Sequence, residues 1–355
     1  MLKRVVVTGV GVVAAGLVGG GQTLTRWLAQ VPSPPSDHAV DDTLLAALMD
    51  GVDARRASRV SRFTVAATRL SLADAGLDDA GAAGFVLGTE HGDLHSAIEF
   101  AEGFLRGGPS GVSALAFPNT VMNTMASAAT IACAAHGPAL TLNVRTVGGE
   151  LAVARAAHTI ASGRLDVALA GGVDVRNPTV DATLAELGDA EMRGEGATVL
   201  VLESLDHARA RGASPCGEIL GAAWRGLPAR PNGVGHRAES RAIAAALAEA
   251  GLAGQAITWA YSSSSGDGPR DAWERALLVR ALGSEITVAS LARRFGQHAG
   301  LGALRVAAAA WSAGSGRLID PPVDVAPGPG LVHGIARGGT HVALVVGPAP
   351  DGVAR

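Results

Sequence analysis

Residues 166–174, Asp166-Val167-Ala168-Leu169-Ala170-Gly171-Gly172-Val173-Asp174, form an apolar run interrupted by a pair of glycines. An alanine-rich segment with helical periodicity, Glu150–Ser162, ends at Gly163 just before this run. A helix that ends on glycine and leads into a buried strand is the repeating unit of layered α/β proteins. The stretch therefore predicts an α/β fold.

The same alternation of short strands and helices continues in both directions. In the first part of the chain, we expect a helix over Ser61–Ala75 and strands over Lys3–Gly11, Phe85–Gly88 and Ala139–Leu142. A second series begins near Gly217, with helices over Glu239–Ala250, Asp271–Leu282 and Ala303–Ser312, and strands over Ile257–Tyr261, Glu285–Ala289 and Val342–Val346. A second glycine pair, Gly338-Gly339, precedes the last strand. We predict an internal duplication, with residues 1–213 and 214–355 as its two halves.

Composition and charge exclude several classes of protein. Hydrophobic residues make up 48% of the 355 residues, aromatic residues only 3%, and 48 residues are glycine, so the core must be built from small aliphatic side chains. The net charge of −3 gives no basic stripe for nucleic acid. Two cysteines are too few for a disulfide framework, and we see no secretory leader, so we expect a cytoplasmic protein. Apolar runs such as Val199–Leu202 are too short to span a membrane.

No cofactor is expected. The start of the chain, with Gly9 and Gly11 after a short strand, has some likeness to a dinucleotide-binding turn. The third glycine of that pattern is Ala14, however, and a proline-rich loop, Val31–Pro35, stands where an acidic strand end is needed.

Seven segments carry a resemblance that covers nearly the whole chain. They are Lys3–Gly11, Phe117–Asn123, Gly137-Pro138, Asp166–Asp174, Gly194–Ala197, Leu200–Ala213 and Gly338–His341. In this order and spacing, they resemble the β-ketoacyl-acyl-carrier-protein synthase family. The resemblance implies a thiolase-like fold, with duplicated βαβαβαββ halves in a layered α/β/α/β/α arrangement.

The family's condensation chemistry uses a cysteine at the N-terminus of a buried helix and two histidines. The resemblance places Thr146 at the nucleophile position and Ser263 at the first histidine. It places Gln297 at the second histidine, or His298 if the loop carries a one-residue gap. Serine cannot exchange a proton as imidazole does near pH 7. We expect Thr146 to cap the following helix, which is worth about 1 kcal/mol, and we expect none of these positions to be catalytic.

Other positions of the resemblance concern shape. The gating loop falls on Arg337, Gly338 and Gly339, with Arg337 where the family has phenylalanine. The tunnel and dimer interface are expected to include His91, Leu115, Ala116, Phe117 and Met122. A side chain inserted at the end of such a tunnel makes further extension clash, at a cost of about 1–3 kcal/mol.

Two further clusters have simpler interpretations. Cys133 and His136 look like a nucleophile and a base, but Cys133 lies in an apolar helix and is expected to pack in the core. His91 and His95 have a spacing that could hold a metal on a helix face. We predict no metal site.

The sequence favours a chain length factor, or ketosynthase-β, of a type II polyketide synthase. Such a subunit would pair with an active ketosynthase in a heterodimer and receive its substrates from an acyl carrier protein. The short chain favours a reducing, polyene-type system. The alternatives are a cysteine-less malonyl decarboxylase, a hydrolase that uses Thr146, and a self-pairing scaffold.

Overall fold

The computed structural model describes residues 2–35, 37–46, 48–49, 57–114, 116–188, 191–227, 229, 233–235 and 239–350. The first half of the chain contains β1 (Val5–Ala14), β2 (Leu17–Gly20), α1 (Gly21–Gln30), α2 (Thr43–Ala46), α4 (Arg59–Ala75), β3 (Gly84–Thr89), α5 (Leu94–Gly107), two 3₁₀ turns, η1 (Gly108–Gly111) and η2 (Phe117–Thr120), α6 (Thr124–Ala132), β4 (Ala139–Asn143), α7 (Gly148–Ala161), β5 (Val167–Asp174), α8 (Pro178–Glu186), β6 (Gly196–Ser204) and α9 (Leu205–Ala210).

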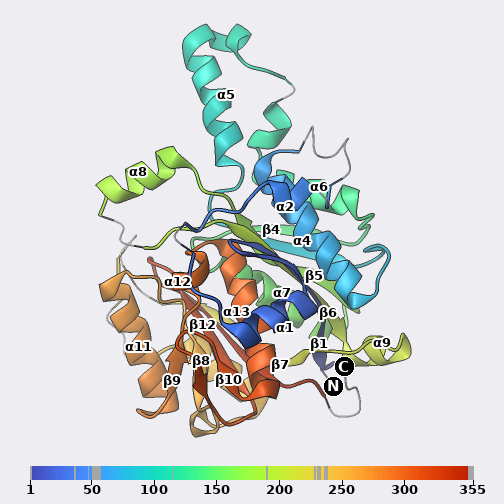
Figure 1. The fold of residues 1–355 in the computed structure, drawn as a ribbon, viewed down its shortest axis with the longest axis vertical. Coiled ribbons are helices and arrows are strands. Elements are labelled where there is room, and N and C mark those ends of the chain that lie inside the picture. The colour runs from blue at the N-terminus through green and yellow to red at the C-terminus, as the bar shows by residue number, and fades with distance from the viewer. Residues whose placement is uncertain are drawn as a thin grey trace.

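The second half follows the same alternation (Figure 1). It contains β7 (Gly217–Gly226), α10 (Arg241–Ala250), η3 (Gly254–Ala256), β8 (Trp259–Tyr261), α11 (Gly268–Leu282), β9 (Thr287–Ala289), α12 (Ala292–Phe295), α13 (Ala299–Ser315), β10 (Arg317–Leu318), β11 (Val323–Asp324), β12 (Gly330–Ile335) and β13 (Thr340–Gly347).

The strand order repeats between the two halves. One mixed sheet has the order β4-β3-β5-β6-β1-β7-β13-β12-β8-β9, and β2 pairs with β1. When β2, β10 and β11 are left out and strands are numbered within each half, both halves read third, second, fourth, fifth, first from the outer edge inward. In each half the first two neighbouring pairs are parallel and the other two are antiparallel. The halves join where β1 pairs antiparallel with β7. This is a thiolase-like mixed α/β fold, and the boundary between residues 213 and 214 stays a prediction.

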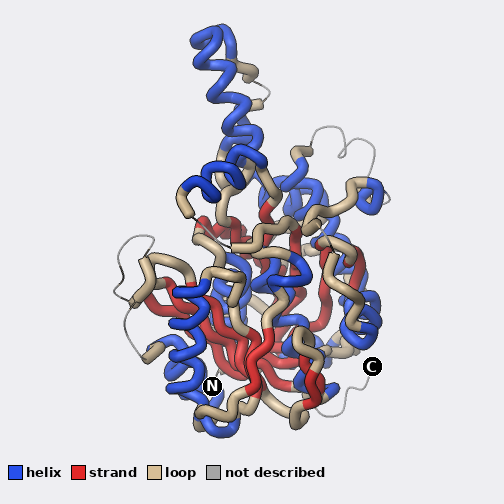
Figure 2. Tube along the Cα trace, turned by 60° about the vertical axis from the view of Figure 1, so that its left-hand side comes forward, coloured by secondary structure: helices blue, strands red, loops and turns tan. Residues whose placement is uncertain are grey.

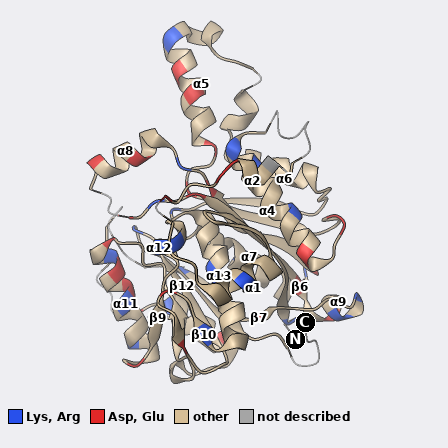
Figure 3. Ribbon diagram, in the orientation of Figure 1, with Lys and Arg blue, Asp and Glu red and all other residues tan. Residues whose placement is uncertain are grey.

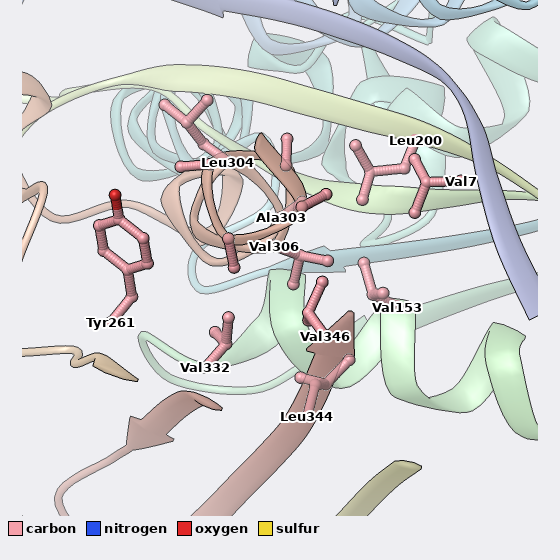
Figure 4. Packing of buried hydrophobic residues seen from close by; sticks show 14 of the residues in the cluster. Val7, Val153, Leu200, Tyr261, Ala303, Leu304, Val306, Val332, Leu344 and Val346 are labelled. Carbon is pink, nitrogen blue, oxygen red and sulfur yellow. The ribbon is translucent and has the colours of Figure 1, made fainter. Parts of the chain in front are cut away.

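Helices α7 and α13 lie between the two halves of the sheet. Helix α7 contacts β3 and β5 on one side and β7 and β13 on the other, and α13 contacts β5, β6, β12 and β13. Around α13, Val306 lies near Leu344 and Val346 of the second half, while Leu200 and Val7 belong to the first half (Figure 4). The two helices can cross closely because Gly149 has no side chain. A Cβ at this position would lie 2.1 Å from the carbonyl oxygen of Ala299. The glycine-rich, aromatic-poor composition is what this close packing requires.

Helices α4, α10 and α11 cover the outer faces of the sheet. Helix α4 packs on β1 and β6, and α10 packs on β7 and β13. Helix α11 contributes Leu278 and Leu282 to the apolar cluster beneath α10. The layers are therefore α/β/α/β/α, as expected from the resemblance.

One segment leaves this compact body. Helix α5 projects away from the sheet, and the chain returns through η1 and η2 (Figures 1 and 2). No residue of α5 is buried, although the helix carries apolar side chains such as Phe104 and Leu105. Among the helices of the described residues, none is both long and apolar enough to cross a bilayer.

Candidate functional site

The candidate site lies where parallel strands β3, β4 and β5 end. The carboxyl ends of parallel strands are the usual place for a binding site in such a fold. A cleft of about 620 Å³ opens there, between the strand ends, α8 and the loop after β12. It is lined by Glu90, His91, Asn143, Arg145, Leu184, Leu187, Gly188 and Arg337.

Thr146 occupies a left-handed turn between β4 and α7. Its φ is 41°, which is rare for a β-branched residue and costs about 1–3 kcal/mol. The N-cap of α7 is Val147, and the buried hydroxyl of Thr146 has no hydrogen-bond partner among the described residues. Our expectation that Thr146 caps the helix through its hydroxyl is therefore wrong. The turn holds the Thr146 side chain at the start of α7 while leaving the hydroxyl unused.

Gln297 is the neighbour of this turn. Its Nε2 donates to the carbonyl oxygen of Thr146 at 3.0 Å, and the side chain is buried. His298, one residue further, is the N-cap of α13, and its ring lies beside Gly196. Burial, together with the nearby charge of Arg305, lowers the pKa of His298 to about 3, so its imidazole is neutral. Of the two candidates for the second histidine position, Gln297 is the one that contacts Thr146.

Ser263 is fully engaged in hydrogen bonds. Its hydroxyl donates to Glu274 Oε2 at 2.9 Å and accepts from the backbone N–H of Ile335 at 3.0 Å. It also accepts from Nη1 of Arg270 at 3.1 Å. The hydroxyl is thus held between a carboxylate and two donors.

Arg270 was not predicted from the sequence. Its guanidinium is fully buried and bonds the carbonyl oxygen and hydroxyl of Ser263, the hydroxyl of Ser265 and the carbonyl oxygen of Ile335. Arg270 therefore places a permanent positive charge against Ser263, the residue that the family resemblance aligns with the first histidine. The only signal in the sequence is an arginine directly before Asp271 of the motif.

Glu274 balances part of this charge. His333 Nδ1 lies 2.9 Å from Glu274 Oε1. Burial works to raise the pKa of Glu274, but the hydrogen bond from His333 and the charges of His333 and Arg270 outweigh it and lower the pKa.

A second buried ion pair lies one turn along α7. Glu150 Oε1 and Arg305 Nη2 are 2.7 Å apart, and both side chains are inaccessible. A Cβ at Gly302 or at Gly334 would lie 1.7 Å or 2.0 Å from the carboxylate oxygens of Glu150, so both glycines are needed to fit it. Burial raises the pKa of Glu150, against the opposing charge of Arg305. Arg305 also donates to the carbonyl oxygen of Ser262 at 3.2 Å, which links α13 to the serine loop.

Of the described residues expected at the tunnel, only His91 lines the cleft. His91 lines the cleft, with its Nε2 3.5 Å from Glu90 Oε2. Phe117 and Met122 are exposed and Ala116 is half-buried on the return segment of the α5 projection, outside the cleft lining. Leu115 lies outside the described residues.

The expected gating loop does border the cleft. Arg337 is part of the lining, and its Nε lies 2.6 Å from Asp267 Oδ2. Gly338 and Gly339 have φ values of 93° and 94°, which favour glycine.

Of the two alternative clusters, Cys133 and His136 differ in burial, and His91 and His95 line a common pocket. Cys133 is buried in the core beneath α4, as predicted, and His136 is exposed. His91 precedes α5, whereas His95 lies in its first turn, so the two do not share a helix face. Within the described ranges, no group of three or more His, Cys, Asp or Glu residues could hold a metal ion.

Comparisons with known proteins assign this fold to a family. Residues 2–185 match the family model of the β-ketoacyl synthase N-terminal domain. A relative from Streptomyces halstedii, named polyketide β-ketoacyl synthase 1, is 34% identical over 80% of this chain and 78% of its own length. The ketoacyl synthase alpha subunit of the tetracenomycin polyketide synthase, from Streptomyces glaucescens, is 28% identical over 87% of this chain and 84% of its own. The chain belongs to the β-ketoacyl synthase family.

Solved structures agree on the fold. The ishigamide ketosynthase/chain length factor superposes with a TM-score of 0.86 at 23% identity, covering 99% of this chain and 100% of that one. A complex of a type II acyl carrier protein with its ketosynthase, AntDE:AntF, contains a chain that superposes with a TM-score of 0.81 at 20% identity, covering 98% and 100%.

Proposed function

We propose that the chain is the chain length factor of a type II polyketide synthase. It pairs with an active ketosynthase, receives no acyl group itself, and shapes the tunnel in which the growing chain lies. The names of its relatives support a place in polyketide synthesis, and a ketosynthase/chain length factor is among the structures of the same fold. We retain the expectation of a reducing system, from the shortness of the chain alone.

The state of the three catalytic positions is the observation that carries this proposal. Thr146 has a hydroxyl that lacks a base, since its neighbour Gln297 is an amide. The hydroxyl of Ser263 donates a hydrogen bond to Glu274 and accepts one from Arg270. His298 is neutral and lies against Gly196. Decarboxylation and hydrolysis would need a group that exchanges protons at this site, so both alternatives lose support.

Pairing is supported by an unusual stretch of surface. Residues 107 to 144 contain no Lys, Arg, Asp or Glu, and Figure 3 shows α6 within it free of charge colouring. Of the eleven large apolar side chains exposed in the described part of the chain, seven fall between residues 104 and 140: Phe104, Leu105, Phe117, Val121, Met122, Ile131 and Leu140. Charge depletion with exposed apolar side chains is typical of a subunit interface.

The same stretch includes an open sheet edge. Strand β4 is the edge strand of the sheet in the first half and pairs only with β3 among the described strands. Its residues Ala139, Leu140 and Asn143 are exposed. An edge of this kind, next to an apolar projection, suits a partner that continues the sheet. We propose an active ketosynthase of the same fold as that partner.

The interface and the cleft are neighbours, which connects pairing to tunnel shape. Asn143 at the end of β4 lines the cleft together with His91. A partner docked on β4 would bring its own tunnel toward His91 and the return segment with Ala116, Phe117 and Met122. Their size, rather than any acid–base property, would set the length of the product.

Co-expression with the ketosynthase of the same biosynthetic system tests the pairing. We expect a stable 1:1 complex by size-exclusion chromatography with light scattering, and no malonyl-carrier decarboxylation by the isolated chain. A well-behaved homodimer without affinity for the ketosynthase would favour the self-pairing scaffold instead. Decarboxylation by the isolated chain would favour the enzyme alternative.

A further inference from the structure

We propose that two arginines, Arg337 and Arg270, clamp the loop after β12 and keep acyl thioesters away from position 146. This inference goes beyond the proposed function, because it concerns access to the chain's own site whether or not a partner docks. It rests on hydrogen bonds that join the loop to helix α11 and on the charges that line the cleft.

The first tie is made by Arg337 itself. Its Nε and Nη2 lie 2.6 Å and 2.5 Å from Asp267 Oδ2. The Asp267 side chain is only 3% exposed, and its other oxygen accepts from the backbone N–H of Arg270 as the N-cap of α11. Moving Arg337 away would leave a buried carboxylate without its cation, which is costly. The arginine is therefore fastened to a fixed point on α11.

The second tie holds the base of the loop. Arg270 Nη1 donates to the carbonyl oxygen of Ile335, the last residue of β12, at 2.8 Å. Arg270 is in turn fixed by Ser263 and by Ser265, whose hydroxyl lies 2.8 Å from Nη2. The loop is thus held at two points, Ile335 and Arg337, by residues at the start of α11.

Backbone hydrogen bonds close the rest of the loop. Gly338 N–H donates to the carbonyl oxygen of Gly233 at 3.1 Å, and Leu227 N–H donates to that of Gly339 at 2.7 Å. A Cβ at Gly339 would lie 2.1 Å from the carbonyl oxygen of Leu227, so the two backbone segments pack too closely for any side chain at this position. Opening this loop would break two backbone bonds as well as the arginine contacts.

The clamped loop borders the same cleft as Arg145, the residue before Thr146. Arg337 and Arg145 line the same cleft, and Arg145 directly precedes Thr146, which is buried. Glu90, which also lines the cleft, pairs with Arg145 Nε at 3.3 Å through Oε1 and with Arg193 Nη1 at 2.8 Å through Oε2. An alkyl chain between these ion pairs would remove water from the charged groups without offering hydrogen bonds in its place, which is unfavourable. The loop thus forms one wall of the cleft, and the ion pairs beside Thr146 disfavour an acyl chain there.

A thiol introduced by the substitution Thr146→Cys reports on this access. We would follow its alkylation by iodoacetamide with peptide mass spectrometry, which resolves the introduced thiol from Cys133 and Cys216 in one sample. With the clamp intact, the introduced thiol should react as slowly as Cys133, which is buried in the core. Adding Arg337→Ala or Asp267→Asn should accelerate its alkylation by about tenfold or more and leave Cys133 unchanged.

A matched control separates the clamp from the loss of any ion pair. Arg106→Ala removes the exposed pair between Arg106 and Glu102 in α5, and the alkylation rate of the introduced thiol should not change. The inference fails if that thiol reacts rapidly with the clamp intact, or if both clamp variants leave its rate unchanged. It also fails if Cys133 accelerates in parallel, which would indicate global unfolding. Because the isolated chain is used, the outcome does not depend on whether a ketosynthase binds.

Discussion

Gln297 donates from Nε2 to the carbonyl oxygen of Thr146, joining two positions at which the family resemblance places a histidine and a cysteine. Thr146 lies in a left-handed turn, and the side chain of Gln297 is buried beside it. An amide and a secondary hydroxyl cannot supply a thiolate or exchange protons near neutral pH. The proposed role as a chain length factor therefore rests on the absence of a thiol and an imidazole from Thr146 and Gln297.

Restoring the nucleophile alone should not restore condensation. Thr146→Cys puts a thiol at the start of α7 but leaves Ser263 and Gln297 in place of imidazoles. We expect no acyl-enzyme above background when the variant is incubated with an acyl carrier protein thioester and examined by intact-protein mass spectrometry. Stoichiometric acylation followed by turnover would show that the assignment of these positions is wrong.

The buried pair of Glu150 and Arg305 should behave as a coupled unit. Arg305→Met leaves the carboxylate between Gly302 and Gly334 without its cation, and we expect a loss of about 3 kcal/mol in the free energy of unfolding. The double variant Glu150→Gln/Arg305→Met should lose less than the sum of the two single variants. Urea unfolding of the four proteins measures the coupling, and additive losses would contradict it.

His298 should make the fold sensitive to acid. Its pKa is about 3 in the folded chain and about 6.5 in the unfolded chain, so between these values the unfolded chain binds a proton that the folded chain excludes. The free energy of unfolding therefore falls as pH drops below about 6.5, by about 2 kcal/mol at pH 5 from this residue. His341, whose pKa burial also lowers to about 3, adds to the effect.

Substitution of His298 isolates its share. In urea titrations at pH 8 and pH 5, His298→Asn should lose about 2 kcal/mol less than the parent between the two pH values. His136→Gln, which removes an exposed imidazole, serves as the control and should keep the parent's acid-dependent loss. An unchanged pH dependence in His298→Asn would contradict the neutral, buried state of this imidazole.

The apolar, charge-free stretch should be the surface that binds the ketosynthase. Leu140→Lys on the edge strand should weaken the complex by about 100-fold, as expected for a central interface side chain. Val323→Lys is a matched control, because Val323 is 38% exposed and Leu140 is 39% exposed, and Val323 lies on the distant β11. Biolayer interferometry gives the affinities. Equal weakening by both substitutions, or by neither, would remove β4 from the interface.

Much of the fold could be predicted because its strands and central helices are locally regular. The runs at Phe85–Gly88 and Val342–Val346 and the helix at Ser61–Ala75 all appear within a few residues of their predicted bounds. Strand β12 was missed because glycine and the buried His333 interrupt its apolar pattern. The α5 projection was missed because its apolar side chains meet no core in this chain.

The candidate site was less predictable, since it depends on contacts between distant segments. A one-residue ambiguity between Gln297 and His298 could not be decided by spacing, and the hydrogen bond to Thr146 decides which of them contacts the turn. The capping prediction for Thr146 failed because α7 begins one residue later than expected, with Val147 as its N-cap and no capping hydrogen bond from a side chain. Arg270 and Arg305 look like surface residues in sequence, and only their tertiary partners explain their burial.

The most direct test of the account asks which subunit carries the growing chain. The purified complex with the ketosynthase would be given malonyl- and acyl-loaded carrier protein, and the intact mass of each subunit would be recorded during turnover. We predict acyl adducts on the ketosynthase only, with no mass change on this chain and no product when the ketosynthase's nucleophilic cysteine is replaced by alanine. An acyl adduct on this chain, or condensation by this chain alone, would contradict the account.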